Sequence, residues 1–370
     1  MTKYKPKKYK LPGSVFSPFK SFIMKRITTC LLLFFNMVGY AQPNPQALLT
    51  QVVAKAKQVS LYTSIVNWDS LQMQVNAQAA NAKTINDLKP AFEALLNGLK
   101  DHHGSIVNAR NYTTMARFTD YANLHHPDTR VRQTILHNAV NNTALHFEYA
   151  ILKGNVGYLK IVGIAPNVDV AKESQQIRDA LIQLSQSGIQ HYIVDLRYNG
   201  GGNMNPMMAG LGPLIGDGIA GKLVNLAGDV LFNWEINNGN FIYGGSQVVT
   251  LNNKPLFKTL PRVAVLTSMH TVSSGEVVAT AFKGRPATRF FGEATGGYTT
   301  NNGWDIINGE VILNISTGIF CDRNGTVYKY NIPVDTEIPF EIMEDKEKDN
   351  CIIAARKWLA AVPAVQAGSQ

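Results

Sequence analysis

The sequence predicts an α/β domain preceded by a smaller helical region. Near the start of the chain, apolar side chains recur at intervals of three and four, which places them on one face of a helix. The clearest set is Ile85, Leu88, Phe92, Leu95 and Leu99. Further along, short apolar runs alternate with amphipathic stretches, which is the order of elements in an α/β fold.

The α/β part is expected to alternate between strands and helices. We expect strands over Val156–Val162, Tyr192–Leu196 and Arg262–Leu266, and helices over Val168–Gln186 and Gly275–Lys283. Loops that follow the ends of such strands often carry functional side chains, because a rigid scaffold holds them in place.

A hairpin and a helix are expected to close the chain. The hairpin would pair Val311–Phe320 with Thr326–Tyr330 through a turn at Asp322–Gly325, where an Asn-Gly pair supplies the positive φ angles of a tight turn. The closing helix is expected from about Asn350 to Ala361.

Composition and periodicity divide the chain into four parts. We expect a leader over residues 1–41, a helical region over 42–104, a connecting segment over 105–150 and an α/β core over 151–365. The connecting segment is rich in Asn, Thr and His and has weak periodicity, so the sequence predicts no particular element within it.

The leader accounts for the basic charge of the chain. Residues 1–41 hold eight Lys or Arg and no acidic residue, whereas the rest holds 27 basic and 26 acidic residues. A basic start at Met24, an apolar stretch and small residues up to Ala41 predict a signal peptide over 24–41, with 1–23 a mis-assigned start or a basic extension. We therefore expect cleavage near Ala41, a periplasmic or extracellular protein, no nucleic-acid partner and no later membrane span.

Cysteine and histidine give no sign of a cofactor. Cys321 and Cys351 are compatible with one disulfide and equally with two unrelated buried thiols. The histidines that could form a cluster have no recognisable metal-ligand spacing: they are His102, His103, His125 and His126. We expect neither a metal nor another cofactor.

A glycine-rich loop follows the strand that ends near Leu196. The run Asp195–Asn203 enters three consecutive glycines, Gly200, Gly201 and Gly202. Such glycines let backbone N–H groups approach developing negative charge, as an oxyanion hole requires. A plain flexible turn is an alternative, and a phosphate loop is disfavoured because no Lys-Ser/Thr pair follows.

A second strand turns sharply into a helix at Ser273. This junction exposes a hydroxyl beside a helix N-terminus, where negative charge is favoured. Ser273 and Glu276 are also spaced as a capping box, in which the glutamate reaches back to the serine N–H. The two interpretations are compatible, because such a glutamate would rigidify a catalytic turn.

Taken together, three segments resemble the tail-specific (C-terminal processing) serine peptidases. They are Asp195–Gly202, Thr271–Glu276 and Gly292–Gly297, which occur in the family's order and spacing within residues 85–360. The resemblance implies a crotonase-like or ClpP-like α/β core with a central sheet. It also assigns roles to single residues: Ser273 is the nucleophile, Gly200, Gly201, Gly202 and Ser274 supply oxyanion donors, and Arg197, Glu276 and Thr295 support the site.

One position departs from the Ser-Lys members of that family. They place a lysine 25 residues after the serine, where this chain has Tyr298. A branch similar to the tricorn core protease and the retinoid-binding-protein repeats uses an upstream histidine instead, and His103 falls on that position. Neutral imidazole suits the role of general base. The acid that orients His103 stays open between Asp335, Glu337 and Asp101.

The resemblance implies an exported serine endopeptidase acting on polypeptides, with His103 as the base for Ser273. A PDZ module is not expected, because residues 104–150 are too few to hold one. The first alternative is a non-catalytic protein on the same scaffold that binds a ligand or peptide. The second is an acyl-CoA enzyme of the crotonase type, which would leave the serine turn unexplained.

Overall fold

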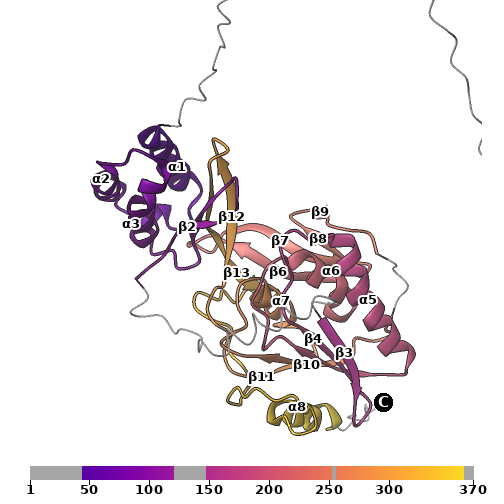
Figure 1. The fold of residues 1–370 in the computed structure, drawn as a ribbon. Helices are drawn as coiled ribbons and strands as arrows, with labels where there is room; N and C mark the ends of the chain where they lie inside the picture. Colours follow the sequence, from indigo (N-terminus) through magenta and orange to yellow (C-terminus); the bar gives the residue numbers. More distant parts are fainter. Residues whose placement is uncertain (1–43, 121–146, 252–255, 362–370) are drawn as a thin grey trace, which may run out of the picture. The chain divides into compact units, whose positions relative to one another are not determined.

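A computed structural model describes residues 44–120, 147–251 and 256–361. The expected leader and signal peptide lie outside these residues. Seven α-helices, two short 3₁₀ helices and two β-sheets are formed within the described residues (Figure 1). None of the helices in this part of the chain is long and apolar enough to cross a membrane.

Three helices form the region before the first strand. They are α1 (Pro45–Val59), α2 (Trp68–Ala79) and α3 (Lys89–Leu99), with 3₁₀ turns η1 (Thr63–Ile65) and η2 (Ile85–Leu88) between them. The apolar stripe expected from the sequence is divided between η2 and α3, and its members are buried or partly buried. Their core continues onto the first of the two sheets, so these helices share apolar contacts with the strands that follow.

The first sheet has eight strands in the order β2-β1-β13-β6-β7-β8-β9, with β12 paired to β13. The strands are β1 (Ser105–Asn108), β2 (Thr114–Arg117), β6 (Gly218–Val224), β7 (Val230–Asn237), β8 (Asn240–Tyr243), β9 (Ser246–Gln247), β12 (Thr300–Ile307) and β13 (Val311–Asp322). The long strand β13 pairs with β1, β12 and β6, and so joins the strand after the helical region to the core.

The second sheet is the expected central sheet, in the order β14-β11-β10-β5-β4-β3. Its strands are β3 (Phe147–Leu152), β4 (Val156–Ile161), β5 (His191–Asp195), β10 (Arg262–Thr267), β11 (Thr288–Gly292) and β14 (Thr336–Glu337). All neighbours are parallel except β3, which pairs antiparallel with β4 at the edge. The carboxyl ends of β5 and β10 therefore open at the same edge of this sheet.

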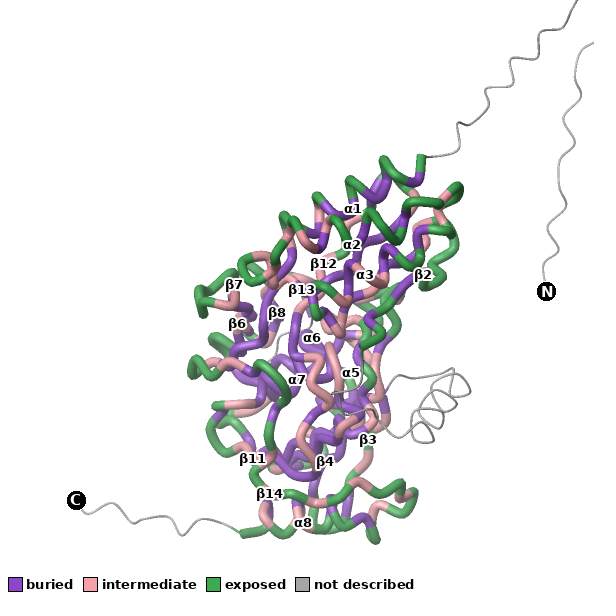
Figure 2. The backbone as a smooth tube through the Cα atoms, turned by 90° about the vertical axis from the view of Figure 1, so that its left-hand side faces the viewer, coloured by how far each residue is buried: buried purple, intermediate pink, exposed green. Residues whose placement is uncertain are grey.

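Helices cover both faces of the central sheet. One face packs with α5 (Val170–Gln186), α6 (Met204–Ile215) and α7 (Ser274–Phe282) in the largest apolar cluster, which also takes in strands of the first sheet. The other face packs against α8 (Asn350–Ala360). The buried positions in Figure 2 concentrate on these inner elements and on the inner side of α1–α3.

The predicted α/β fold class is confirmed, and the strands and helices expected around residues 156–283 are present to within a few residues. The expected hairpin is partly wrong, since Thr326–Tyr330 forms an isolated bridge at Val327 instead of a strand. The Asn-Gly turn does close on Asp322, which accepts three N–H or O–H bonds. Cys321 and Cys351 are free buried thiols, so the possible disulfide is not formed.

Candidate active site

Two loops at the carboxyl edge of the central sheet are joined by hydrogen bonds. The loop after β10 donates from Thr271 Oγ1 to the Leu196 carbonyl at 2.7 Å, and from the Val272 N–H to the Asn199 carbonyl at 3.0 Å. Because both loops leave adjacent parallel strands, these bonds fix the glycine run against the serine turn. The topology thereby brings together two segments about seventy residues apart in the sequence.

Ser273 occupies a strained backbone position at the start of α7. Its φ angle is +53° and its ψ angle is −119°, a region that residues with a Cβ rarely adopt. Glu276 accepts the Ser273 N–H at 2.9 Å, as the capping-box spacing predicts. The carboxylate thus helps hold the serine turn.

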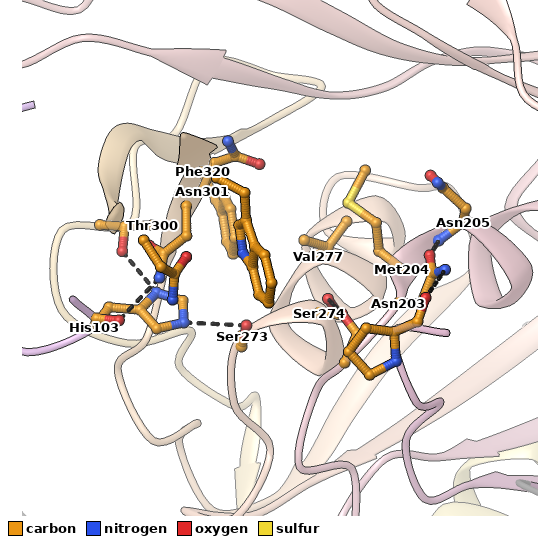
Figure 3. A pocket seen from close by; sticks show the side chains of 15 residues that line it. His103, Asn203, Met204, Asn205, Ser273, Ser274, Val277, Thr300, Asn301 and Phe320 are labelled. Carbon is orange, nitrogen blue, oxygen red and sulfur yellow. Dashed lines mark hydrogen bonds between the residues drawn. The ribbon is translucent and has the colours of Figure 1, made fainter. Parts of the chain in front are cut away.

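His103 lies opposite this serine, on the turn between α3 and β1. Its Nε2 lies 3.2 Å from Ser273 Oγ (Figure 3). The ring is held on its other side by Thr300 Oγ1, 2.9 Å from Nδ1. The backbone is fixed too, because its carbonyl accepts from Asn302 Nδ2 at 2.9 Å and its N–H donates to Asp101 at 3.2 Å.

The surroundings of His103 favour the neutral imidazole. Burial and, to a smaller extent, the charge of His102 lower its pKa to about 3, although a hydrogen bond with the Thr300 backbone opposes the shift. Tyr298, at the position of the family lysine, packs edge-on against both histidine rings, with centroids 5.3 and 5.2 Å away. A neutral imidazole can accept a proton.

Asp101 is connected to His103 through two hydroxyls. It is fully buried and accepts the Ser316 N–H and the Ser316 hydroxyl, both at 2.7 Å. Ser316 Oγ lies 2.9 Å from Thr300 Oγ1, which contacts the histidine ring. Burial raises the pKa of Asp101, while the two backbone N–H groups and the Ser316 hydroxyl oppose that rise.

The other two acid candidates lie elsewhere. Asp335 accepts the Phe290 N–H at 2.7 Å and thus stabilises the edge of the central sheet. Glu337 is exposed in β14, paired in register with Gly292. Neither contacts His103 in the hydrogen bonds of the described residues, whereas Thr300 Oγ1 lies against the ring. Their assignment as the orienting acid stays a prediction.

The glycine loop offers fewer free N–H groups than its sequence suggests. The Gly200 N–H donates to the Val162 carbonyl and the Gly201 N–H donates to Asn199 Oδ1, both at 2.9 Å. Gly202 and Ser274 both line the cavity beside Ser273, and Ser274 Oγ donates to the Gly202 carbonyl at 2.6 Å. Glycine is needed at Gly202, because its φ is +102° and a Cβ there would lie 1.9 Å from the Ile164 carbonyl oxygen.

Arg197 lies at the start of the glycine loop and is held there by two buried carboxylates. Its guanidinium pairs with Asp195 at 2.7 Å and with Asp349 at 2.8 Å, and all three side chains are at most 4% exposed. The Ser268 hydroxyl donates to the Arg197 carbonyl at 2.6 Å, which ties this ion cluster to the loop after β10. Arg197 lowers the pKa of Asp195 against the effect of burial.

Glu276 and Thr295 form a second buried support. Thr295 Oγ1 donates to Glu276 Oε1 at 2.5 Å, and the Gly297 N–H donates to the same oxygen at 2.9 Å. Burial raises the pKa of Glu276 to about 8, although these donors favour the charged form. The carboxyl therefore joins the serine turn to the segment that carries Tyr298.

A cavity of about 580 Å³ opens over the two reactive side chains. Its apolar wall contains Met204, Val277, Trp304 and Phe320, and its polar lining is mostly asparagine. Figure 3 shows His103 and Thr300 on one side of Ser273, with Met204 and Asn203 on the other. Among the described residues, His103 is the one titratable side chain in the lining of this cavity.

Residues 155–338 match the sequence pattern of peptidase family S41. This stretch carries Ser273, the glycine loop and every supporting residue named above except Asp101 and Asp349. The domain is an S41 peptidase domain. His103 and Asp101 precede the matched stretch. They lie between α3 and β1, outside the S41 domain that carries Ser273.

A curated relative covers most of the chain that contains the S41 domain. It is the nisin-resistance protein of Lactococcus lactis subsp. lactis, 25% identical over 317 residues, which are 86% of this chain and 87% of the relative. The aligned 317 residues are more than the S41 domain at residues 155–338 contains, so the similarity extends beyond that domain.

Solved structures show the same fold at lower identity. A lipoprotein from Streptococcus agalactiae aligns over 86% of this chain and 96% of its own, with a TM-score of 0.64 and 20% identity. The photosystem II D1 C-terminal processing protease aligns over 80% and 93%, with a TM-score of 0.53 and 13% identity. A putative peptidase from Parabacteroides merdae aligns over 86% of this chain and 97% of its own, with a TM-score of 0.56 and 17% identity. These likenesses concern the fold of the S41 domain and its helical region.

Sequence reasoning missed Thr300 and Ser316. A hydroxyl in a polar strand carries no motif, and only the pairing of β12 with β13 places these two side chains beside the histidine turn. The metal alternative involving His102 and His103 finds no support, since no group of three metal-binding side chains occurs in the described residues of the chain; His125 and His126 lie outside them.

Proposed function

We propose that this chain is an exported serine endopeptidase of the C-terminal processing type, with Ser273 as nucleophile and His103 as general base. The observation that carries the proposal is the 3.2 Å approach of His103 Nε2 to Ser273 Oγ in the lining of a cavity. Membership of the S41 domain in a peptidase family supports the reaction class. The lowered pKa of His103 supports a base that is unprotonated at neutral pH.

The reaction follows from this pair of side chains. His103 Nε2 takes the proton of Ser273 Oγ as the oxygen attacks a peptide carbonyl carbon, and it then passes that proton to the leaving amine. Water attacks the resulting ester and gives one proton to His103 Nε2, and the product leaves as a carboxylic acid that loses its remaining proton to solvent. The proton finally returns to Ser273 Oγ, so no external acid or base is consumed.

Two backbone N–H groups are proposed to stabilise the tetrahedral oxyanion, those of Gly202 and Ser274. Both residues line the cavity at Ser273, whereas the N–H groups of Gly200 and Gly201 already have acceptors. Ser274 also opens α7, where helix N–H groups favour negative charge. The set of proposed oxyanion donors is therefore reduced from four residues to two, Gly202 and Ser274.

The cavity favours an uncharged segment of polypeptide. Met204, Val277 and Phe320 would accept an apolar side chain, while the asparagine amides that also line the cavity can bond to peptide groups. The part of the chain that the structure describes places no carboxylate or ammonium group in the cavity lining to pair with a charged side chain. We expect cleavage next to small or apolar residues.

The proposed export rests on the leader pattern and on relatives whose names point to the cell envelope. The structural relative from Streptococcus agalactiae is described as a lipoprotein, and the curated relative is named for resistance to nisin. Nisin therefore belongs among the first candidate substrates. Expression in a bacterial host, followed by fractionation and N-terminal sequencing, tests export; a chain that keeps its leader in the cytoplasm would contradict it.

Incubation of the purified protein with a peptide library and with nisin, read by mass spectrometry, tests the activity. The proposal predicts new termini next to small or apolar residues, and none with Ser273→Ala. A Ser273→Ala protein that still binds a peptide, together with a wild type that cleaves nothing, would favour the alternative of a binding protein on this scaffold.

A further inference from the structure

We infer that Thr300, Ser316 and Asp101 form a hydrogen-bond relay that sets the tautomer of His103, so that Asp101 is the orienting acid acting through two hydroxyls. The inference rests on the proposed function of His103 as base. It names three positioning residues for that site, none of which touches the reacting atoms.

The distances form one unbroken chain. His103 Nδ1 lies 2.9 Å from Thr300 Oγ1, which lies 2.9 Å from Ser316 Oγ, which lies 2.7 Å from Asp101 Oδ1. Each separation is within normal hydrogen-bond range. The hydroxyls of Thr300 and Ser316 can each donate one hydrogen, so the direction of one bond in the chain decides the direction of the next.

An ionised Asp101 accepts only, and this fixes the whole chain. Ser316 gives its one hydrogen to Asp101 Oδ1 at 2.7 Å in preference to Asn302 Oδ1 at 3.4 Å, so Thr300 must donate to Ser316 Oγ. Thr300 Oγ1 is then left as an acceptor, and the ring must supply the hydrogen from Nδ1. His103 therefore carries its proton on Nδ1 and presents a bare Nε2 to Ser273, which is the tautomer that a general base needs.

Burial raises the pKa of Asp101, whereas its hydrogen-bond contacts favour the ionised form that this argument requires. Oδ2 accepts the Ser316 N–H at 2.7 Å, and Oδ1 accepts the His103 N–H at 3.2 Å as well as the Ser316 hydroxyl. Backbone N–H groups cannot reverse and can only donate. A protonated Asp101 would have to place its hydrogen against one of these donors or turn the relay around.

Two ordinary explanations compete with the relay. Asp101 follows the end of α3 and its N–H donates to the Leu96 carbonyl, so its carboxylate could serve the fold alone. The hydrogen bond between His103 and the Thr300 backbone could also hold the ring without the hydroxyl. The relay differs from both, because it predicts that removing one distant hydroxyl changes which ring nitrogen carries the proton.

Nitrogen NMR of histidine tests this in the full chain without a substrate. The protein has eight histidines, so the His103 signals are assigned by their absence in His103→Gln. We expect wild type to show protonated Nδ1 and unprotonated Nε2 at neutral pH. Thr300→Val should shift the population toward the other tautomer, and Thr300→Ser should restore the wild-type pattern.

The neighbouring Thr299 supplies a matched control. It is a fully buried threonine whose hydroxyl has no hydrogen-bond partner among the described residues. Thr299→Val therefore makes the same chemical change one position away. The His103 pattern in Thr299→Val should equal that of wild type, which separates the relay from a general effect on β12.

Asp101→Asn should reverse the direction of the hydrogen bonds in the relay while keeping a side chain of nearly the same size. The amide can donate to Ser316, Ser316 then donates to Thr300, and Thr300 donates to Nδ1, which moves the ring proton to Nε2. We expect protonated Nε2 and reaction with a serine-directed phosphonate slowed on the order of 100-fold. Ser316→Ala breaks the relay at its middle and covers the case in which Asp101→Asn does not fold.

The two sets of results separate the relay from the proposed function. Wild type and Thr300→Val with the same Nδ1-protonated pattern would overturn the relay, whatever the activity. If Thr300→Val changes the tautomer of His103 but the wild-type protein never reacts at Ser273, the relay is kept and the peptidase proposal is overturned.

Discussion

Glu276 holds the backbone of Ser273, the residue three positions before it, through one carboxylate oxygen. Its Oε2 accepts the Ser273 N–H at 2.9 Å, and its Oε1 accepts from Thr295 and Gly297. The serine keeps a positive φ angle within this arrangement. A single buried carboxyl thus links the serine turn to the segment beside the histidines.

Glu276→Gln should slow the reaction of Ser273. Because burial raises the pKa of Glu276 to about 8, the comparison is made at about pH 9, where the carboxylate has two acceptor oxygens and glutamine has one. Either the Ser273 N–H or the Thr295–Gly297 side then loses its acceptor. We expect phosphonate labelling to fall by about 10-fold or more, with the fold retained, as for the loss of a group that positions a nucleophile. Labelling kinetics followed by intact mass measure this. Labelling at the wild-type rate would show that Glu276 only caps α7.

Two glycine substitutions should have opposite outcomes. A Cβ at Gly202 would lie 1.9 Å from the Ile164 carbonyl oxygen and would require φ of +102°, whereas a Cβ at Gly200 meets nothing within 4 Å. We expect Gly202→Ala to lower labelling by about 100-fold, the scale of losing an oxyanion donor. Gly200→Ala keeps its N–H bond to Val162 and should stay near wild type. A large loss in Gly200→Ala would restore Gly200 as an oxyanion donor.

Arg197→Met should be strongly destabilising. The change leaves Asp195 and Asp349 buried and facing each other without their shared cation. Removing one partner from a buried ion cluster costs about 3–5 kcal/mol. Urea denaturation at neutral pH measures the free energy of unfolding. The paired substitution Arg197→Met with Asp349→Asn should recover part of the loss, and an additive result would show that the two residues act independently.

The buried histidine predicts a defined pH dependence of stability. The pKa of His103 is lowered to about 3 in the folded chain, and its ordinary value is about 6.5. Below about pH 6.5 the unfolded state binds a proton that the folded state excludes, so stability falls as pH drops from there toward the folded pKa. Since His103 keeps an edge at the cavity, we expect about 1–2 kcal/mol between pH 7 and pH 5.

His103→Gln isolates that contribution. Other groups titrate over the same range, so the difference in unfolding free energy between pH 7 and pH 5 is compared in wild type and variant. The wild type should lose more stability on acidification. An equal loss in both would mean that His103 is not held in its neutral form by burial.

The sequence predicted the α/β core because periodicity and turn residues act locally. β5, β10 and α7 lie where apolar runs and a helix start signal place them. The strands from Gly218 to Gln247 were not expected, because two of them are short and all pair antiparallel with partly exposed faces. Thr326–Tyr330 was expected as a strand from its turn, yet tertiary packing leaves it a single bridge at Val327.

The residues of the candidate site also fall into those with a sequence motif and those without one. Ser273, His103 and the glycine loop were found through motifs, and the structure brings them together. The orienting group of His103 was sought among acids downstream, whereas the ring contacts the Thr300 hydroxyl. Thr300 and Ser316 meet only through the pairing of β12 with β13, whose register shifts between Asn301 and Asn302, and the sequence carries no local signal of that pairing. The boundaries at residues 104 and 150 and the leader remain predictions.

The most direct test of the central claim is labelling of the protein with a fluorophosphonate serine probe, read by intact mass in wild type, Ser273→Ala and His103→Ala. A serine activated by a neighbouring base forms one covalent adduct, and an unactivated serine forms none. The account predicts one adduct on wild type, no adduct on Ser273→Ala, and a rate lower by about 100-fold or more in His103→Ala. A folded wild type that takes up no probe between about pH 6 and pH 9, or an adduct that persists in Ser273→Ala, would contradict it.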